Sequence, residues 1–242
     1  MASATLSDTA TQTATLSHGV LEPKGLPGGG AACGEWAARF DAIYREAAGD
    51  MDRVPWAHRR ACPSMIAWLN AEAPALVRCG ARAAVVGCGL GMDAAALVER
   101  GYDVVALDVS PTAIEWARRL HPAHADMFVQ ADIFDLPSRL RNRFDLVIEV
   151  HTLQALPPEY RSGIASGAAS LLSPRGGILL AVCRGREPGT RVEISAGPPF
   201  ALTRDELVGL MTGCGLSPVR EVDEFLDENS PPVRRLRGAF RR

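Results

Sequence analysis

Short apolar runs alternate with amphipathic segments along the chain from about residue 80 onward. The runs predict strands at the following positions: 83–86, 104–107, 127–129, 144–150 and 177–182. Between these runs, apolar residues recur at helical spacing in 92–100 and 157–172, and Ser110-Pro111 is a favourable start for one more helix. Strands that alternate with helices predict an α/β fold, in which helices cover both faces of a largely parallel sheet.

The C-terminal part of the chain adds a helix and a pair of strands. Thr203 and Glu206 form a capping box, which predicts a helix that ends near Thr212. The segments 219–225 and 233–240 are then expected to pair as antiparallel strands. The sheet would therefore close on an antiparallel pair.

The first 34 residues differ from the rest in composition. They are rich in Ala, Thr, Ser and Gly and lack apolar periodicity, so we predict a flexible leader that cannot compensate for the entropy lost on ordering. Helical spacing of apolar residues begins in 36–44 and returns in 63–76. The predicted organisation is a leader at 1–34 and a single domain at 35–242, divided into a helical part at 35–78 and an α/β core at 79–242.

The net charge and the cysteine spacing indicate which partners and which cellular compartment to expect. The formal net charge is -2, so no basic field attracts the chain to nucleic acid. The six cysteines show no C-x-x-C spacing, which argues against a structural zinc site or a disulfide framework and favours a reducing compartment. The sequence has neither the pattern of a signal peptide nor an apolar run long enough to cross a bilayer. We therefore expect a cytoplasmic protein without a metal site.

A glycine-rich turn follows the first predicted strand. Its glycines are Gly87, Gly89 and Gly91, and glycine permits a positive φ and leaves room for a ligand against the backbone. The dinucleotide-binding form G-x-G-x-x-G needs its third glycine at the position of Met92. The G-x-G-x-G form found here, with Asp93 after it, departs from that pattern. A strand-to-helix turn without a ligand is the alternative, although one glycine would suffice for it.

Two acidic residues follow the second and third predicted strands. Asp108 comes about 20 residues after the first glycine, where a carboxylate can accept from both hydroxyls of a ribose. Asp132 could accept from an adenine amino group while the backbone N–H of Ile133 meets the ring. Taken singly, Asp108 could be a solvated acid and Asp132 the cap of its own turn. Their register with the glycines favours a nucleoside site.

The fourth predicted strand leads to two further candidates. Period-two alternation places Asp145, Val147, Glu149 and His151 on one face if the strand continues that far. Glu149 could then meet a cationic part of the cofactor at the carboxyl edge of the sheet, where α/β folds bind ligands. His151 could act as a general base toward a nucleophile, because its pKa lies near neutrality. A hydrogen-bonded packing histidine is the alternative.

Together these motifs resemble those of class I S-adenosylmethionine-dependent methyltransferases from about residue 80 to the end. The matching segments are Val85-x-Gly87-Cys-Gly-x-Gly-x-Asp93-Ala, Gly101-x-x-Val104, Asp108-x-Ser110 and Phe144-Asp-Leu-Val147. Within that superfamily, the segments Leu153-Gln-Ala-Leu-Pro-Pro-Glu-Tyr-Arg161 and Gly197-Pro-Pro-Phe-Ala-Leu-Thr203 resemble the thiopurine S-methyltransferase-like branch of small-molecule enzymes. In that branch the fourth strand usually ends in Asp and then Gly, and this chain has Glu149 and His151 there.

The resemblance implies a fold and a set of binding residues. The fold is a Rossmann-like, seven-stranded, mostly parallel sheet of order 3-2-1-4-5-7-6, with the last strand antiparallel and 35–78 as an N-terminal helical lid. The cofactor-binding residues implied are Gly87, Gly89 and Gly91 at the methionine part, Asp108 and Val109 at the ribose, Asp132 and Ile133 at the adenine, and Glu149. The substrate-binding candidates are Tyr44, Trp56 and His151.

The reaction implied is in-line transfer of a methyl group from S-adenosylmethionine to a sulfur, nitrogen or oxygen atom of a small molecule. The cofactor carries its own leaving group, so the protein mainly supplies alignment and a dry pocket. Two alternatives remain, an NAD(P)-dependent oxidoreductase and a non-catalytic nucleotide-binding module of the same fold. Met92 at the third glycine position argues against the first. The expected partner is a small-molecule substrate and neither nucleic acid nor a membrane, and both a monomer and a homodimer stay open.

Overall fold

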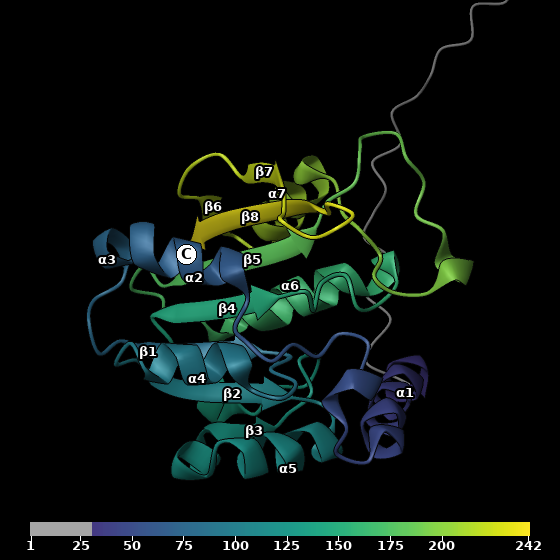
Figure 1. The fold of residues 1–242 in the computed structure, drawn as a ribbon. Coiled ribbons are helices and arrows are strands. Elements are labelled where there is room, and N and C mark those ends of the chain that lie inside the picture. Colours follow the sequence, from purple (N-terminus) through teal and green to yellow (C-terminus); the bar gives the residue numbers. More distant parts are fainter. Residues whose placement is uncertain (1–30) are drawn as a thin grey trace, which may run out of the picture.

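One mixed sheet organises residues 31–242, the part of the chain that the computed structural model describes (Figure 1). Its strands are β1 Arg82–Val86, β2 Asp103–Asp108, β3 Phe128–Gln130, β4 Leu146–Val150, β5 Ile178–Arg184, β6 Ser217–Pro218, β7 Asp223–Leu226 and β8 Arg234–Arg241. The order is β3-β2-β1-β4-β5-β8-β6, and β7 pairs with β8. The strands β1 to β5 are all parallel to one another, whereas β8 is antiparallel to β5. The predicted strand order, with an antiparallel last strand, is confirmed.

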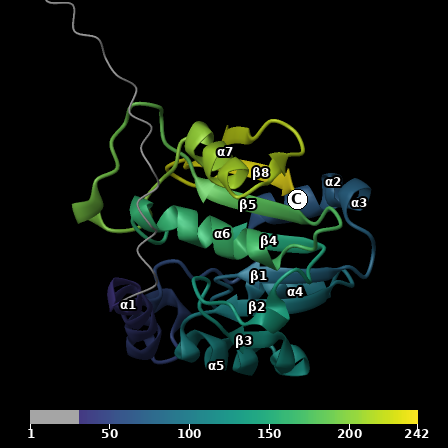
Figure 2. The same ribbon diagram turned by 180° about the vertical axis from the view of Figure 1, so that it is seen from behind.

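Helices cover both faces of this sheet. They are α1 Ala31–Ala47, α2 Pro63–Ala71, α3 Ala73–Leu76, α4 Met92–Val98, α5 Pro111–Leu120, α6 Arg161–Leu171 and α7 Arg204–Gly213, with short 3-10 turns at η1 Met51–Arg53, η2 Pro122–Met127, η3 Ser138–Leu140, η4 Pro158–Tyr160 and η5 Ile194–Ala196. Figure 1 shows α2 and α4 in front of the sheet, and Figure 2 shows α6 and α7 on the opposite face. Each face has its own apolar core. The central strands are therefore buried on both sides, as parallel sheets usually are.

Both predicted N-terminal helices are present, but with other bounds than predicted. α1 begins at Ala31, four residues before the predicted domain boundary, and the rest of the predicted leader lies outside the described residues. The second predicted helix is split into α2 and α3, because Pro74 cannot continue a helix from the preceding turn. Met65 and Trp68 of α2 are fully buried against the sheet. Of the helical part predicted at 35–78, α2 thus packs on the sheet, and a lid formed by α1 and the loop after it stays a prediction.

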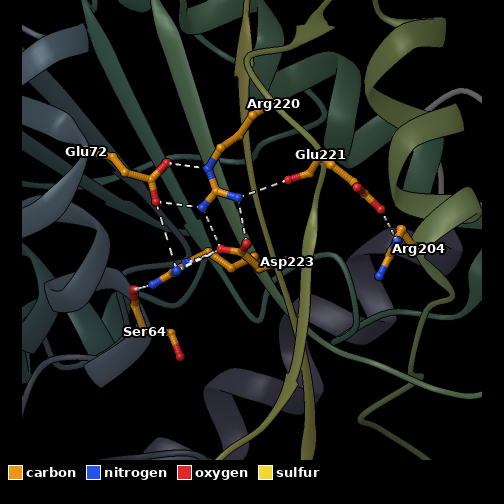
Figure 3. Close-up of polar contacts among 7 residues, drawn as sticks. Ser64, Glu72, Arg204, Arg220, Glu221 and Asp223 are labelled. Atoms are coloured by element: carbon orange, nitrogen blue, oxygen red, sulfur yellow. Dashed lines mark hydrogen bonds and ion pairs between the residues drawn. The ribbon is translucent and has the colours of Figure 1, made fainter.

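The predicted sixth strand, 219–225, is present as two short strands. β6 and β7 both pair with β8, and the chain leaves the ladder between them around Arg220. The guanidinium group of Arg220 donates to both carboxylate oxygens of Glu72 (2.7 and 2.8 Å) and of Asp223 (2.6 and 2.7 Å), as Figure 3 shows. This interruption gives the sheet eight strands instead of seven. None of the described helices combines the length and the apolar character needed to cross a bilayer.

Candidate active site

The glycine turn after β1 is held by side chains from three other parts of the chain. Gly87, Gly89 and Gly91 all have positive φ, at 61°, 51° and 84°. A Cβ atom on Gly87 would overlap the hydroxyl group of Thr152, and one on Gly91 would lie 2.5 Å from the ring of Phe128. Backbone geometry and packing therefore require glycine at both positions even without a ligand. Gly87 is exposed, so the turn is also open on one side.

Asp108 links the end of β2 to this turn. Its Oδ2 accepts from the backbone N–H of Gly89 (2.8 Å), and its Oδ1 accepts from that of Ser110 (2.9 Å). Burial raises the pKa of the carboxyl group, although the two backbone donors favour its ionised form. A carboxylate has about four lone-pair sites, so each oxygen can still accept one more hydrogen bond.

The segment after β3 lies beside Asp108 at the same edge of the sheet. Asp108 is in register with Gln130, and the N–H of Ala131 donates to the carbonyl of Asp108 (2.9 Å). The Oδ1 of Asp132 accepts from the N–H of Phe134 (2.9 Å), so this acid does cap its own turn. Its Oδ2 has no partner among the described residues and stays available to a ligand.

Glu149 is bonded to the turn that follows β4. Its side chain is fully buried, and its Oε1 accepts from the N–H groups of Thr152 (2.6 Å) and Leu153 (2.9 Å). Its Oε2 lies 3.6 Å from the thiol of Cys183. Burial raises the pKa of this carboxyl group to about 7. These contacts fix the turn that follows β4, and contact of Glu149 with the methionine part of the cofactor stays a prediction.

His151 begins that turn. β4 ends at Val150 and His151 has a φ of 67°, so the predicted strand face does not extend to it. Residues other than glycine rarely adopt a positive φ, and the branch that the sequence resembles usually has glycine at this position. The Nε2 of His151 lies 3.1 Å from Nη1 of Arg235. Burial, and then the Arg235 charge, lower the pKa of His151 to about 4, so the imidazole is neutral and accepts from the guanidinium group.

Aromatic side chains cover this edge of the sheet. The Nε1 of Trp56 donates to the hydroxyl of Tyr44 (2.8 Å), and the two rings are nearly perpendicular. Tyr44 is buried, and its hydroxyl lies 3.0 Å from where a Cβ of Gly89 would be. Trp36 of α1 packs edge-on against Phe200, which lies in the long segment after β5. The sequence places Tyr44 and Trp56 near the site, but no local pattern indicates Phe200.

Asp41 attaches α1 to this edge and was not predicted. Its Oδ1 accepts from the hydroxyl of Ser110 (2.7 Å) and from the N–H of Thr112 (3.0 Å), at the start of α5. Ser110 also caps α5 through the N–H of Ala113 (3.0 Å), as the sequence predicts. Because 69 residues separate Asp41 from Ser110, no spacing rule could have paired them.

The arrangement fits S-adenosylmethionine better than a dinucleotide. Asp108 occupies the Gly89 N–H and places a negative charge beside the glycine turn, where a pyrophosphate would need donors. The free lone pairs of Asp108 and the free Oδ2 of Asp132 suit the hydroxyl and amino donors of an adenosine. A surface hollow of about 460 Å³ lies between α6 and α7, and none of the predicted site residues lines it.

Comparisons with known proteins agree with this geometry. The family model described as thiopurine S-methyltransferase matches residues 46–238. The chain is 32% identical over 130 residues to thiocyanate methyltransferase 1 of Brassica oleracea, covering 52% of this chain and 55% of the relative. It is 30% identical over 149 residues to probable thiol methyltransferase 2 of Arabidopsis thaliana, covering 60% of this chain and 62% of the relative. The chain thus spans little more than half the length of these relatives.

Solved structures share the fold over most of the chain. One solved structure comes from work on the conversion of a disulfide bond into a thioacetal group during echinomycin biosynthesis. It aligns to this chain with a TM-score of 0.66 and 26% identity, and the alignment covers 85% of this chain and 92% of the other. The 1,6-didemethyltoxoflavin-N1-methyltransferase of Burkholderia thailandensis, with bound S-adenosylhomocysteine, has a TM-score of 0.67 and 21% identity, with coverages of 88% and 91%.

Proposed function

Because the chain belongs to the thiopurine S-methyltransferase family, we propose that it transfers the methyl group of S-adenosylmethionine to a sulfur atom of a small molecule. The observation behind this choice is that the two titratable side chains at the end of β4 are both engaged by other residues. Glu149 is occupied by two backbone donors, and the Nε2 of His151 faces Arg235. A thiolate is already a strong nucleophile near neutral pH, so it needs no base, unlike a hydroxyl group or an ammonium. The similarity to thiol and thiocyanate methyltransferases supports this choice.

The residues that would hold the cofactor lie at the ends of β1, β2 and β3. The three glycines of the turn let the cofactor approach the backbone, and Asp108, with Val109 next to it, accepts from the ribose hydroxyls. The free oxygen of Asp132 accepts from the adenine amino group, and Ile133 follows it. When bound, S-adenosylmethionine supplies an electrophilic methyl group on a sulfonium that leaves as a neutral thioether.

The remaining site residues orient the acceptor and exclude water. Tyr44 and Trp56, joined by their hydrogen bond, form one wall beside the glycine turn. His151 forms the wall at the end of β4, where its neutral imidazole accepts a hydrogen bond instead of taking a proton. Alignment in a closed site accounts for much of the rate of such displacements, so these contacts are the protein's main contribution.

An acceptor panel tests the proposal. The wild-type protein is incubated with S-adenosylmethionine and with matched aromatic thiols, amines and phenols, and release of S-adenosylhomocysteine is measured. We expect turnover with the thiols to exceed that with the other two classes at least tenfold. The Asp108→Asn variant should bind S-adenosylhomocysteine at least tenfold more weakly in calorimetry, because a charge-assisted hydrogen bond contributes about 1.5–3 kcal/mol. Asp145→Asn, at the opposite edge of the sheet, is the matched control. Preferred methylation of amines or phenols would refute the sulfur acceptor.

We also propose that the protein acts in the cytoplasm on a small molecule and not on nucleic acid. All five cysteines with described side chains are free thiols, and Cys183 is buried against Glu149, where a reducing compartment would keep it intact. The formal net charge of -2 gives no attraction to a phosphate backbone. Cell fractionation tests the compartment, and light scattering separates a monomer from a homodimer.

A further inference from the structure

Two arginines lie opposite each other on β5 and β8, and one of them contacts His151. Arg184 ends β5, and Arg235, near the start of β8, is its cross-strand partner. Directly opposite residues of an antiparallel pair have their side chains on the same face, and like charges there destabilise the pair. The side chain of Arg235 is only 17% exposed, so its charge is poorly solvated.

Arg235 is held from two sides, and part of its guanidinium group is left free. Its Nε donates to Oδ2 of Asp227 (2.7 Å), and its Nη1 lies 3.1 Å from Nε2 of His151. A guanidinium group carries five N–H donors. Nη2 has no partner among the described residues, and neither has the second hydrogen of Nη1. Arg184 is exposed and forms no ion pair with any described acid, so among the described carboxylates only Asp227 pairs with either arginine.

Contacts connect Arg235 to the glycine turn. His151, which accepts from Arg235, precedes Thr152, and the hydroxyl of Thr152 donates to the carbonyl of Val86 (3.1 Å) at the end of β1. Thr152 also fills the space beside Gly87. Arg235 is therefore linked through His151 and Thr152 to the turn that would hold the methionine part of the cofactor.

We propose that Arg235 recognises a carboxylate group of the methyl acceptor, with Arg184 as a second positive charge. Asp227 and His151 orient the guanidinium group, and its free N–H donors match the two oxygens of a carboxylate. The aromatic wall of Tyr44 and Trp56 favours a flat apolar body for the rest of the molecule. The acceptor class is thus an aromatic or similarly flat thiol that carries a carboxylate. This inference rests on the proposed sulfur methylation.

Matched ligands test it without relying on turnover. In the presence of S-adenosylhomocysteine, calorimetry compares 4-(methylthio)benzoate with 4-(methylthio)benzamide, which differ in charge and hardly in shape. We expect the wild-type protein to bind the acid at least tenfold more tightly. The R235Q variant should lose this preference while its affinity for the amide is unchanged, and R235K should keep part of it, because lysine keeps the charge and loses the fork. R234Q changes the preceding residue of β8, whose side chain pairs with Glu187 and Glu224. This control variant should keep the full preference for the acid.

The possible results separate the carboxylate inference from the proposed sulfur methylation on which it rests. Equal binding of acid and amide by the wild-type protein, or an unchanged preference in R235Q, overturns the inference. If R235Q does not fold, the wild-type comparison and R235K still decide it. Turnover of 4-mercaptobenzoate and 4-mercaptobenzamide separates the inference from its premise. Methylation of both thiols with equal KM refutes only the carboxylate site, whereas methylation of neither refutes the sulfur acceptor.

Discussion

At the scale of single residues, existing hydrogen bonds decide what each acid at the carboxyl edge can still accept. Asp108 and Asp132 each keep acceptor capacity, since each accepts only part of the hydrogen bonds that a carboxylate can take. Glu149 lies in the same region of the sequence pattern, but its carboxylate is fully enclosed and serves the turn after β4. Chemically similar side chains therefore have different functions because their environments differ.

The enclosed carboxyl of Glu149 should give the protein a defined pH dependence. Burial raises its pKa from 4.5 to about 7, so between these values the folded state keeps a proton that the unfolded chain has lost. The free energy of unfolding should therefore fall as pH rises through this window, by on the order of 3 kcal/mol. We expect Glu149→Gln to remove this decline when urea unfolding is measured from pH 5 to 8.

The matched control is Glu159→Gln, because Glu159 is exposed. Its pH profile should follow that of the wild-type protein. If the Glu149→Gln profile also runs parallel to the wild-type profile, the carboxyl group does not titrate in this range and the interpretation is wrong.

At the scale of elements, the carboxylate of Asp41 joins α1 to the start of α5. Asp41 accepts two hydrogen bonds from the start of α5, and α1 carries Tyr44 to the glycine turn. The apolar side chains of α1 pack against α5 in a small cluster, whereas those of α2 pack on the sheet itself in one of the two main cores. The cover of the site should therefore open more easily than the rest of the fold.

Removing the Asp41 contacts should loosen α1 selectively. We expect Asp41→Ala to speed amide hydrogen exchange in α1 at least tenfold, since hydrogen bonds to a charged group contribute about 1.5–3 kcal/mol. The exchange of β1 and β4 should change little. Hydrogen-exchange mass spectrometry measures both, with Glu46→Gln on the exposed side of α1 as the control. Uniform acceleration across the sheet would show that α1 is part of the global folding unit.

At the scale of the whole molecule, an ion-pair network connects the N-terminal helices to the C-terminal strands. Arg220 bridges Glu72, at the end of α2, and Asp223 of β7, across 148 residues of sequence (Figure 3). Arg237 of β8 donates to the same Asp223 (2.7 Å). Hydrogen bonds from Arg220, and then from Arg237, lower the pKa of Asp223 to about 2. The network therefore stays ionised at all physiological pH values.

Breaking this network should cost a measurable but small part of the stability. Arg220 is 44% exposed, so solvent screens its pairs, and we expect R220M to lower the free energy of unfolding by about 1 kcal/mol. The loss should shrink in 1 M salt. A double-mutant cycle with E72Q isolates the bridge, and a coupling energy near zero would show that it only follows the packing of α2.

The sequence by itself determined the order and kind of the elements in the α/β core. Apolar runs, capping boxes and glycine turns act within a few residues, so the cap of α7 at Thr203 and the turn after β1 were predictable from local patterns. The strand order was predicted from the family resemblance alone. The family match confirms the resemblance that these local motifs carried.

Only the tertiary structure decided which side chains meet at the site. Arg235 and His151 contact each other although they are 84 residues apart, and Asp41 reaches Ser110 from another helix. The inward orientation of Glu149 and the burial of α2 on the sheet also depend on contacts between distant segments. Such pairs leave no periodic trace in the sequence, because they form only after helices and strands have packed. For this reason the glycine turn could be predicted from motifs, whereas the contacts of Glu149 and His151 needed the fold.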